Sequence, residues 1–204
     1  MKYVDLQKNL EKLGVFSIED IRLFDNKFEK KKLHLWTQKW YLKNIRRGFY
    51  VYGSLNINES LQYFAANKIY TPSYISLEAA LNYYSIIPEQ TFVVTSVWTQ
   101  KTVDFDTPIG HFSYKKIRKN LFWGYTIIRL QGYKILMWEP EKAILDYFYL
   151  KSQIKDLADL EGLRWNKELL KERLDFEKLG KYAQMYESKT IEKKVNLLLQ
   201  YIQW

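Results

Sequence analysis

Apolar residues at helical spacing alternate along the chain with short runs of strand-forming residues. Leu77, Leu81 and Tyr84 recur at helical spacing behind Ser76, which stands where a helix cap belongs. Residues 91–97, TFVVTSV, are mostly β-branched or aromatic, which is typical of a strand. This part of the chain therefore predicts a helix that leads into a sheet.

The N-terminal quarter predicts three short helices followed by a β-hairpin. The first helix ends at Gly14, where a left-handed cap is usual, and the second is capped by Ser17. The third spans residues 27–39. Residues 40–52 then read as two strands, with residues 46–48, Arg-Arg-Gly, at the bend between them.

The third helix has an apolar face and a basic, polar face. Phe28, Leu35 and Trp36 are expected to point inward, which leaves the cationic side chains for solvent or a partner. Three helices followed by a basic hairpin is the order of a winged helix-turn-helix, in which the third helix enters the DNA major groove. A solvated helix face without any partner is the alternative. The candidate DNA-binding residues are Lys27, Lys30, Lys31, His34, Thr37, Gln38, Arg46 and Arg47.

The remaining residues predict a second, mixed domain, so the expected fold class is α/β in the α+β sense. Residues 1–55 would be the winged helix-turn-helix domain, and residues 56–204 would hold linking helices, an antiparallel sheet over 91–138 and helices over 140–204. Asn58 is the expected cap of the linking helix 57–69, and Pro140 opens the first C-terminal helix. Further helices are expected at 154–160, 166–174, 175–186 and 190–204.

The formal charge of +9 is concentrated in two segments. Residues 1–60 hold 12 Lys and Arg against 7 Asp and Glu, which gives +5, and residues 111–134 hold 6 against none, which gives +6. The second segment interleaves cations with aromatic residues. This pattern is typical of nucleic-acid binding and equally typical of the solvent-exposed face of an ordinary strand. A protein- or RNA-binding module is therefore the alternative function. The residues of this second candidate patch are Lys115, Lys116, Arg118 and Lys119.

The sequence offers little for catalysis. Asp104 and Asp106 alternate on a predicted strand and could hold Mg²⁺ for nucleotidyl transfer. However, no phosphate-cradling turn precedes them, and no acid occurs between Asp106 and Glu139. No phosphate-binding loop, dinucleotide fingerprint or metal-binding histidine pair is present. We therefore predict no enzyme activity, no cofactor and no metal.

Cysteine is absent, which suits a reducing compartment. No segment approaches the roughly 20 apolar residues of a membrane span. The sequence thus predicts a cytoplasmic protein without a membrane partner.

Several motifs resemble the AbiE-type phage-defence antitoxin family, whose members are described as predicted transcriptional regulators of viral defence systems. Arg46-Arg47-Gly48-Phe49-Tyr50 resembles the hairpin of that family. The other matching segments are residues 72–81, 87–89, 94–97, 107–110 with Phe112 and Tyr114, and 140–143 running into Leu145 and Asp146.

This resemblance implies a non-catalytic antitoxin of a type IV toxin–antitoxin system. Such a protein would bind operator double-stranded DNA through an N-terminal winged helix and repress its own operon. Its second partner would be a nucleotidyltransferase-like toxin encoded beside it, which such an antitoxin counters with or without a stable complex.

Overall fold

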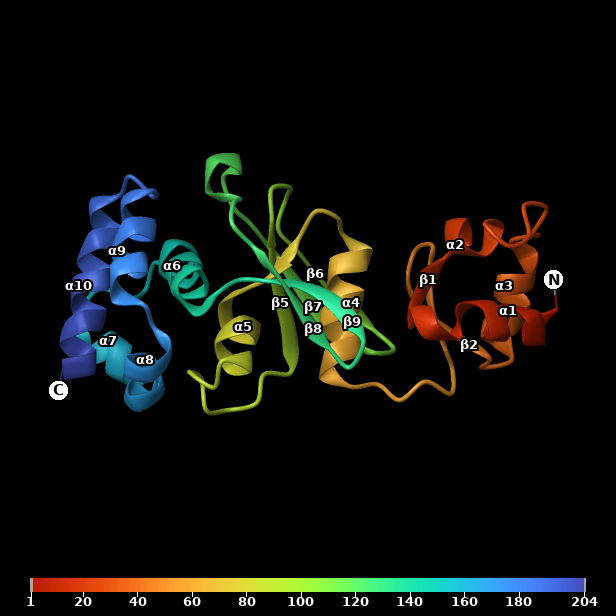
Figure 1. The fold of residues 1–204 in the computed structure, drawn as a ribbon, viewed down its shortest axis with the longest axis horizontal. Helices are drawn as coiled ribbons and strands as arrows, with labels where there is room; N and C mark the ends of the chain where they lie inside the picture. The colour runs from red at the N-terminus through yellow and green to blue at the C-terminus, as the bar shows by residue number, and fades with distance from the viewer. Residues whose placement is uncertain (1, 204) are drawn as a thin grey trace.

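The computed structural model describes residues 2–203 and has a mixed α+β fold. Three parts follow one another along the long axis of the molecule (Figure 1). We call residues 2–52 the head, residues 59–150 the body and residues 157–203 the C-terminal helices. The head and the C-terminal helices lie at opposite ends, with the body between them (Figure 1).

The head combines helices with a three-stranded antiparallel sheet of order β1-β3-β2. Gly14 turns the chain after the first helix with a φ of +67°, and Ser17 caps α2 by accepting a hydrogen bond from the Asp20 amide. The turn at Gly14, the cap of α2 and the hairpin are thus found where the sequence predicts them, although the ψ of Gly14, −66°, is not that of a left-handed cap. The head elements are α1 (Tyr3–Leu10), η1 (Glu11–Leu13), β1 (Val15–Ser17), α2 (Ile18–Arg22), α3 (Lys31–Gln38), β2 (Leu42–Arg46) and β3 (Phe49–Tyr52).

Three details of the head differ from the prediction. Strand β1 was not predicted, and α3 begins at Lys31 rather than at residue 27. Leu35, expected inside, is 51% exposed, while Leu33 is buried. Two residues correspond to roughly 200° around a helix, so burying Leu33 turns Leu35 outward.

The body is built on a six-stranded sheet of order β6-β7-β5-β4-β9-β8. The expectation of an antiparallel sheet was wrong in part, because β5 pairs with β7 and β4 pairs with β9 in parallel. Strands β6 and β7 form a hairpin and run in opposite directions. Because β5 pairs with β7 and not with β6, the next strand in the sequence, β5 and β7 run in the same direction. The body elements are α4 (Glu59–Ile69), β4 (Tyr74–Ile75), α5 (Leu77–Tyr83), β5 (Val93–Trp98), β6 (Val103–Thr107), β7 (Gly110–Lys116), η2 (Lys119–Leu121), β8 (Thr126–Leu130), β9 (Tyr133–Met137) and α6 (Pro140–Leu150).

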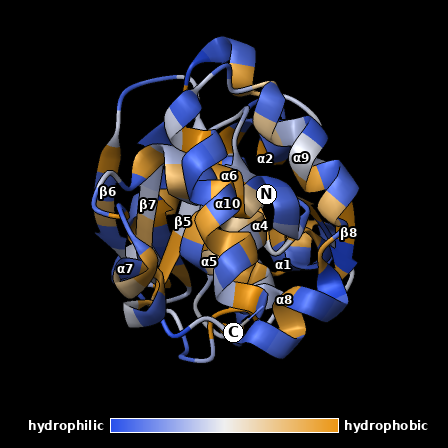
Figure 2. Cartoon of the chain, turned by 90° about the vertical axis from the view of Figure 1, so that its left-hand side faces the viewer, coloured by the Kyte–Doolittle hydropathy of each residue, from blue (hydrophilic) through white to orange (hydrophobic). Residues whose placement is uncertain are grey.

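The C-terminal helices form a small helical unit against α6. Asp156, Asn166 and Asp175 each cap the helix that follows by accepting a hydrogen bond from a backbone amide. Apolar and polar residues alternate around these helices (Figure 2). No helix within residues 2–203 is both long and apolar enough to cross a membrane. The elements are α7 (Leu157–Gly162), α8 (Lys167–Arg173), α9 (Phe176–Gln184) and α10 (Lys189–Gln203).

A buried polar cluster joins the sheet to the C-terminal helices. The carboxylate of Asp146 on α6 is fully buried and forms an ion pair with Lys142, one helical turn away. The same carboxylate accepts hydrogen bonds from the Tyr74 hydroxyl (3.1 Å), the Ser76 hydroxyl (3.0 Å) and the Tyr186 hydroxyl (2.6 Å). Ser76 therefore holds Asp146 and makes no side-chain cap to α5, contrary to the prediction. We call these five residues the Asp146 cluster.

The head sheet has apolar residues on both faces. Tyr50 and Tyr52 face a small core formed within the head. Val15, Ile45 and Val51 point the other way and belong to the large core shared with the body. The head and the body are therefore packed together through this sheet.

Candidate nucleic-acid interface

A groove lies between helix α3 and the hairpin formed by β2 and β3. Its helix side was predicted from the sequence, whereas its strand side was not. We call it the head groove. The residues that line it are Lys30, Lys31, His34, Thr37, Asn44 and Tyr50.

The groove residues combine cations with groups that both donate and accept hydrogen bonds. Lys31 forms an exposed ion pair with Glu29, which raises the pKa of the Lys31 ammonium. The Thr37 hydroxyl donates to the carbonyl of Leu33 at 2.8 Å and keeps its lone pairs free to accept. His34 Nε2 lies 3.1 Å from the side-chain amide nitrogen of Gln38, so the side chains of these two candidate residues are in contact.

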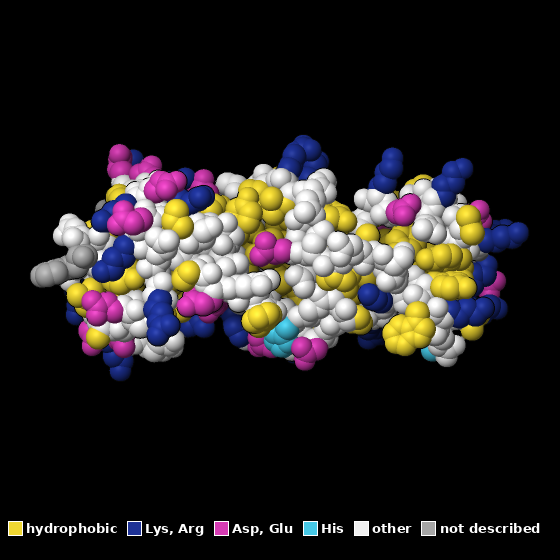
Figure 3. All heavy atoms as spheres, turned by 90° about the horizontal axis from the view of Figure 1, so that it is seen from below, with side chains coloured by type: hydrophobic (Ala, Val, Ile, Leu, Met, Phe, Trp, Pro, Cys, Tyr) yellow, Lys and Arg dark blue, Asp and Glu magenta, His cyan; other side chains and the backbone are white. Residues whose placement is uncertain are grey.

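A second hollow adjoins the head groove and extends it along the hairpin. Arg47 and Gly48, at the hairpin bend, line this hollow together with Lys30. Gly48 has a φ of +88°, a left-handed conformation that suits a tight turn. Lys30 therefore belongs to both hollows and links the helix face to the hairpin tip. Lys and Arg side chains project from the head end of the molecule (Figure 3).

Arg46 does not lie with these residues. Its Nη2 donates a hydrogen bond to the Tyr70 hydroxyl at 2.7 Å, and its guanidinium lies over the ring of Phe105 in the body. Between Asn44 and Arg46 the pairing of β2 with β3 shifts register, and a bulge of this kind re-aims side chains. We therefore leave Arg46 out of the interface. Lys27 is exposed in the turn that precedes α3.

The candidate patch at 115–119 is not gathered on one face. Lys115 forms an ion pair with Asp104, whose Oδ1 is 3.1 Å from Nζ. Lys116 is the next residue on β7, and successive side chains of a strand point to opposite sides. The Arg118 guanidinium lies 6.0 Å from the centre of the Tyr149 ring. Lys119 begins η2 and is exposed.

Asp104 and Asp106 project from the same side of β6. They stand opposite Ser113 and His111 of β7 in the strand pairing. Asp106 Oδ1 lies 2.7 Å from His111 Nδ1, while Asp104 contacts Lys115. Each carboxylate of the pair is thus engaged by a basic side chain of the neighbouring strand.

Asn44 and Tyr50 are the groove residues that the sequence analysis missed. They are cross-strand partners in the hairpin. The signal was available in the period-two alternation of β2, because Leu42 faces the head core and Asn44, two residues on, shares its face. The polar side chain of Asn44 on this apolar face indicates that α3 does not cover the sheet at that point.

No protein-family model matches the sequence, and no curated protein shows significant similarity to it.

Proposed function

We propose that the head binds double-stranded DNA and that the protein acts as an antitoxin that represses its own operon. The observation that carries the DNA-binding proposal is the head groove, in which Lys30, Lys31 and His34 from α3 meet the hairpin. The order of helices and strands in the head, with β1 pairing the hairpin, is the order found in winged helix-turn-helix domains.

In the proposed complex, α3 lies in the major groove and the head groove receives one sugar-phosphate strand. Lys30 and Arg47 neutralise phosphates together, because both line the hollow at the hairpin tip. Half-buried Thr37 and exposed Gln38 lie at the C-terminal end of α3 and offer donors and acceptors to base edges. The cations supply affinity, and the polar side chains supply sequence preference.

The antitoxin role rests on the sequence resemblance described above. Two of the segments that carry the resemblance, residues 72–81 and 140–146, meet in the Asp146 cluster. The second proposed partner is a nucleotidyltransferase-like toxin encoded next to this protein. Co-expression should restore the growth of cells that produce this toxin, and a toxin equally lethal with and without the protein would refute the role.

The DNA-binding proposal is tested by fluorescence anisotropy with DNA from the protein's own promoter. The affinity should fall with salt, with a log–log slope of about −0.9 for each phosphate neutralised. Replacing Lys30 and Arg47 by alanine should weaken binding and reduce the steepness of that slope. An affinity that does not depend on salt would contradict the proposal.

Neutralising Lys116 and Lys119 instead provides the matched control. Both variants remove two positive charges, but only the first changes the head groove. Equal losses would show that net charge alone attracts DNA. A larger loss in the Lys116 and Lys119 variant would move the interface to the patch at 115–119.

A further inference from the structure

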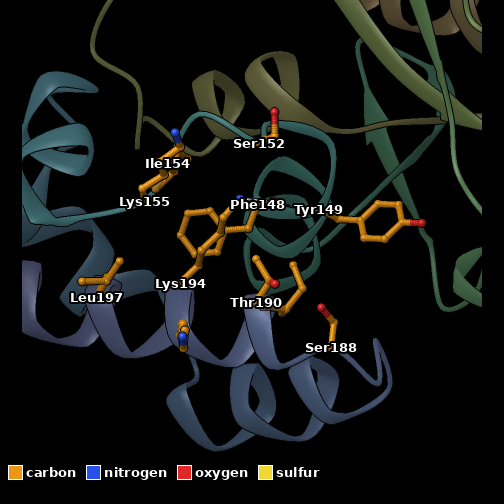
Figure 4. Close-up of a pocket in the computed structure, with 11 residues that line it drawn as sticks. Phe148, Tyr149, Ser152, Ile154, Lys155, Ser188, Thr190, Lys194 and Leu197 are labelled. Atoms are coloured by element: carbon orange, nitrogen blue, oxygen red, sulfur yellow. Dashed lines mark hydrogen bonds between the residues drawn. The ribbon is translucent and has the colours of Figure 1, made fainter.

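A cationic pocket lies between the end of α6 and the first turns of α10, far from the head. Three lysines line it, together with the hydroxyl groups of Ser152, Ser188 and Thr190. No carboxylate is among its lining residues. In Figure 4, Ser152 and Lys155 come from the segment after α6, while Ser188, Thr190 and Lys194 come from the start of α10. We call it the α6–α10 pocket.

Lys194 is the unusual member of this pocket. Its side chain is only 4% exposed, and its ammonium donates to the carbonyls of Phe148 (2.6 Å) and Lys151 (2.7 Å). An ammonium has three N–H donors, so one donor remains beyond these two carbonyls. Burial lowers the pKa of Lys194, and both of these acceptors are neutral. These carbonyls lie at the C-terminal end of α6, where the helix dipole favours a cation, and a bound anion would stabilise the buried ammonium further.

The other charges around the pocket add to this positive potential. Lys155 and Lys193 line its edge and are exposed. Arg118 lies over the ring of Tyr149, another lining residue. Helix α10 is 15 residues long and begins at Lys189, so the positive end of its dipole lies at the same place. The negative end of α6 is there too, and Lys194 already donates to its terminal carbonyls. Glu187 and Glu192 flank this helix start in sequence, but neither lines the pocket.

The size of the pocket favours a ligand larger than a free ion. Its volume is about 440 Å³, within the range of small-molecule sites and much larger than the share of one water, about 30 Å³. Ile154, Ile191 and Leu197 supply apolar surface beside the cations. A phosphate with an organic group attached would use both kinds of surface.

We propose that the α6–α10 pocket binds the phosphate group of a small phosphate monoester, such as a nucleotide. Lys155, Lys193 and Lys194 would hold the dianion, with Ser188 and Thr190 donating from their hydroxyls. This site is separate from the head groove and does not depend on DNA binding.

Isothermal titration of the full-length protein with three probes tests the proposal. Adenosine monophosphate should bind, inorganic phosphate should bind more weakly, and adenosine should not bind. Equal affinities for inorganic phosphate and the nucleotide would show that the pocket recognises only the anion, which would overturn the monoester proposal. Equal binding of adenosine and its monophosphate, or no binding of either phosphate probe at millimolar concentration, would overturn the phosphate site itself.

The variant Lys155→Ala/Lys193→Ala locates the site. It should weaken nucleotide binding by about tenfold for each lysine, which corresponds to about 1.4 kcal/mol. Both lysines are exposed, so the unliganded variant should melt at the same temperature as the original protein. Lys171→Ala/Lys181→Ala removes the same charge elsewhere in the C-terminal helices and should bind normally.

Thr190→Val provides a second test, because it removes a hydroxyl and no charge. It should weaken nucleotide binding while leaving the melting temperature unchanged. Undiminished affinity in both the double-lysine and the Thr190 variants would place the nucleotide elsewhere and overturn the assignment.

Discussion

The guanidinium of Arg46 lies 4.1 Å from the centre of the Phe105 ring and connects the head hairpin to strand β6 of the body. Tyr70 completes the contact by accepting a hydrogen bond from Arg46 Nη2. Arg47, the next residue, is exposed and lines the hollow at the hairpin tip. Two adjacent arginines therefore have different roles, one in packing and one in the proposed DNA contact.

Replacing these two arginines separately should give opposite results. Arg46→Ala removes a cation–π contact and a hydrogen bond, so the free energy of unfolding should fall by about 1–2 kcal/mol. Arg47→Ala should change it by less than about 0.5 kcal/mol but weaken DNA binding. Urea denaturation and DNA anisotropy measure the two effects. Similar stability losses in both variants would contradict this division of roles.

Gly14 should tolerate no side chain. It has a φ of +67°, and an added Cβ would lie 2.5 Å from the Tyr133 hydroxyl and 2.7 Å from the ring. The Tyr133 ring stacks on Phe64 at 4.8 Å, so it has little freedom to move away. We expect Gly14→Ala to lower the free energy of unfolding, both through backbone strain and through the clash with Tyr133. The clash alone should cost about 1–3 kcal/mol.

The matched control is Gly132→Ala. Gly132 also has a positive φ, +87°, but an added Cβ would meet nothing within 4 Å. Thermal unfolding of both variants should show the larger loss at Gly14. Shortening Tyr133 to leucine in the Gly14→Ala background should recover part of it. Equal losses at the two glycines would indicate backbone strain alone.

The Asp146 cluster should be sensitive to a single change of charge. Asp146→Asn leaves the buried Lys142 ammonium without its counter-charge, and breaking a buried pair costs about 3–5 kcal/mol. Glu177→Gln, which weakens an exposed ion pair with Lys181, should change stability by less than about 1 kcal/mol. Chemical denaturation compares the two. Replacing Lys142 and Asp146 together by methionine and leucine should be less damaging than Asp146→Asn alone.

Stability should fall as the pH rises above about 10. Burial raises the pKa of Tyr147 to about 12 and raises those of Tyr74 and Tyr186 well above their usual value of 10. The unfolded chain would lose these phenol protons first, so proton loss favours unfolding between pH 10 and the raised pKa values. The stabilisation is complete below pH 10 and is lost above it.

Lys142 should contribute with the opposite sign. Burial lowers its pKa below 10.5, so the unfolded chain holds this proton longer and stability rises with pH in the window below 10.5. Lys194, whose pKa burial also lowers, acts in the same direction as Lys142. The three tyrosines outnumber these two lysines and leave a net loss of stability on the alkaline side. Circular dichroism follows unfolding, and tyrosinate absorbance follows the ionisation of tyrosine. The buried tyrosines should ionise in the same pH range in which the protein unfolds. Surface tyrosines can ionise without unfolding, so only ionisation of all 17 tyrosines before unfolding would contradict the assignment.

Local signals in the sequence predicted most helices and their caps. Ser17 and Asn58 accept the expected backbone hydrogen bonds, because a cap depends on residues three positions away. Asn166 and Asp175 do the same at the starts of two helices that the sequence predicts. The two-residue strand β4 and the parallel pairs were not predictable in this way. They depend on strands that are distant in the sequence.

The candidate site was predictable to a similar degree. Lys30, Lys31 and His34 were identified because helical spacing places them opposite the buried face of α3. Arg46 could not be distinguished from Arg47, because the bulge that turns Arg46 toward the body leaves no mark in the local sequence. The α6–α10 pocket was missed for the same reason, since its walls meet only in the folded chain.

The two-sided apolar sheet of the head limits how this protein can be dissected. Val15, Ile45 and Val51 are buried only because the body covers them. A fragment that ends at residue 55 would expose this apolar face to water and would be prone to aggregate, even with its own small core intact. Experiments on DNA recognition should therefore use the whole chain.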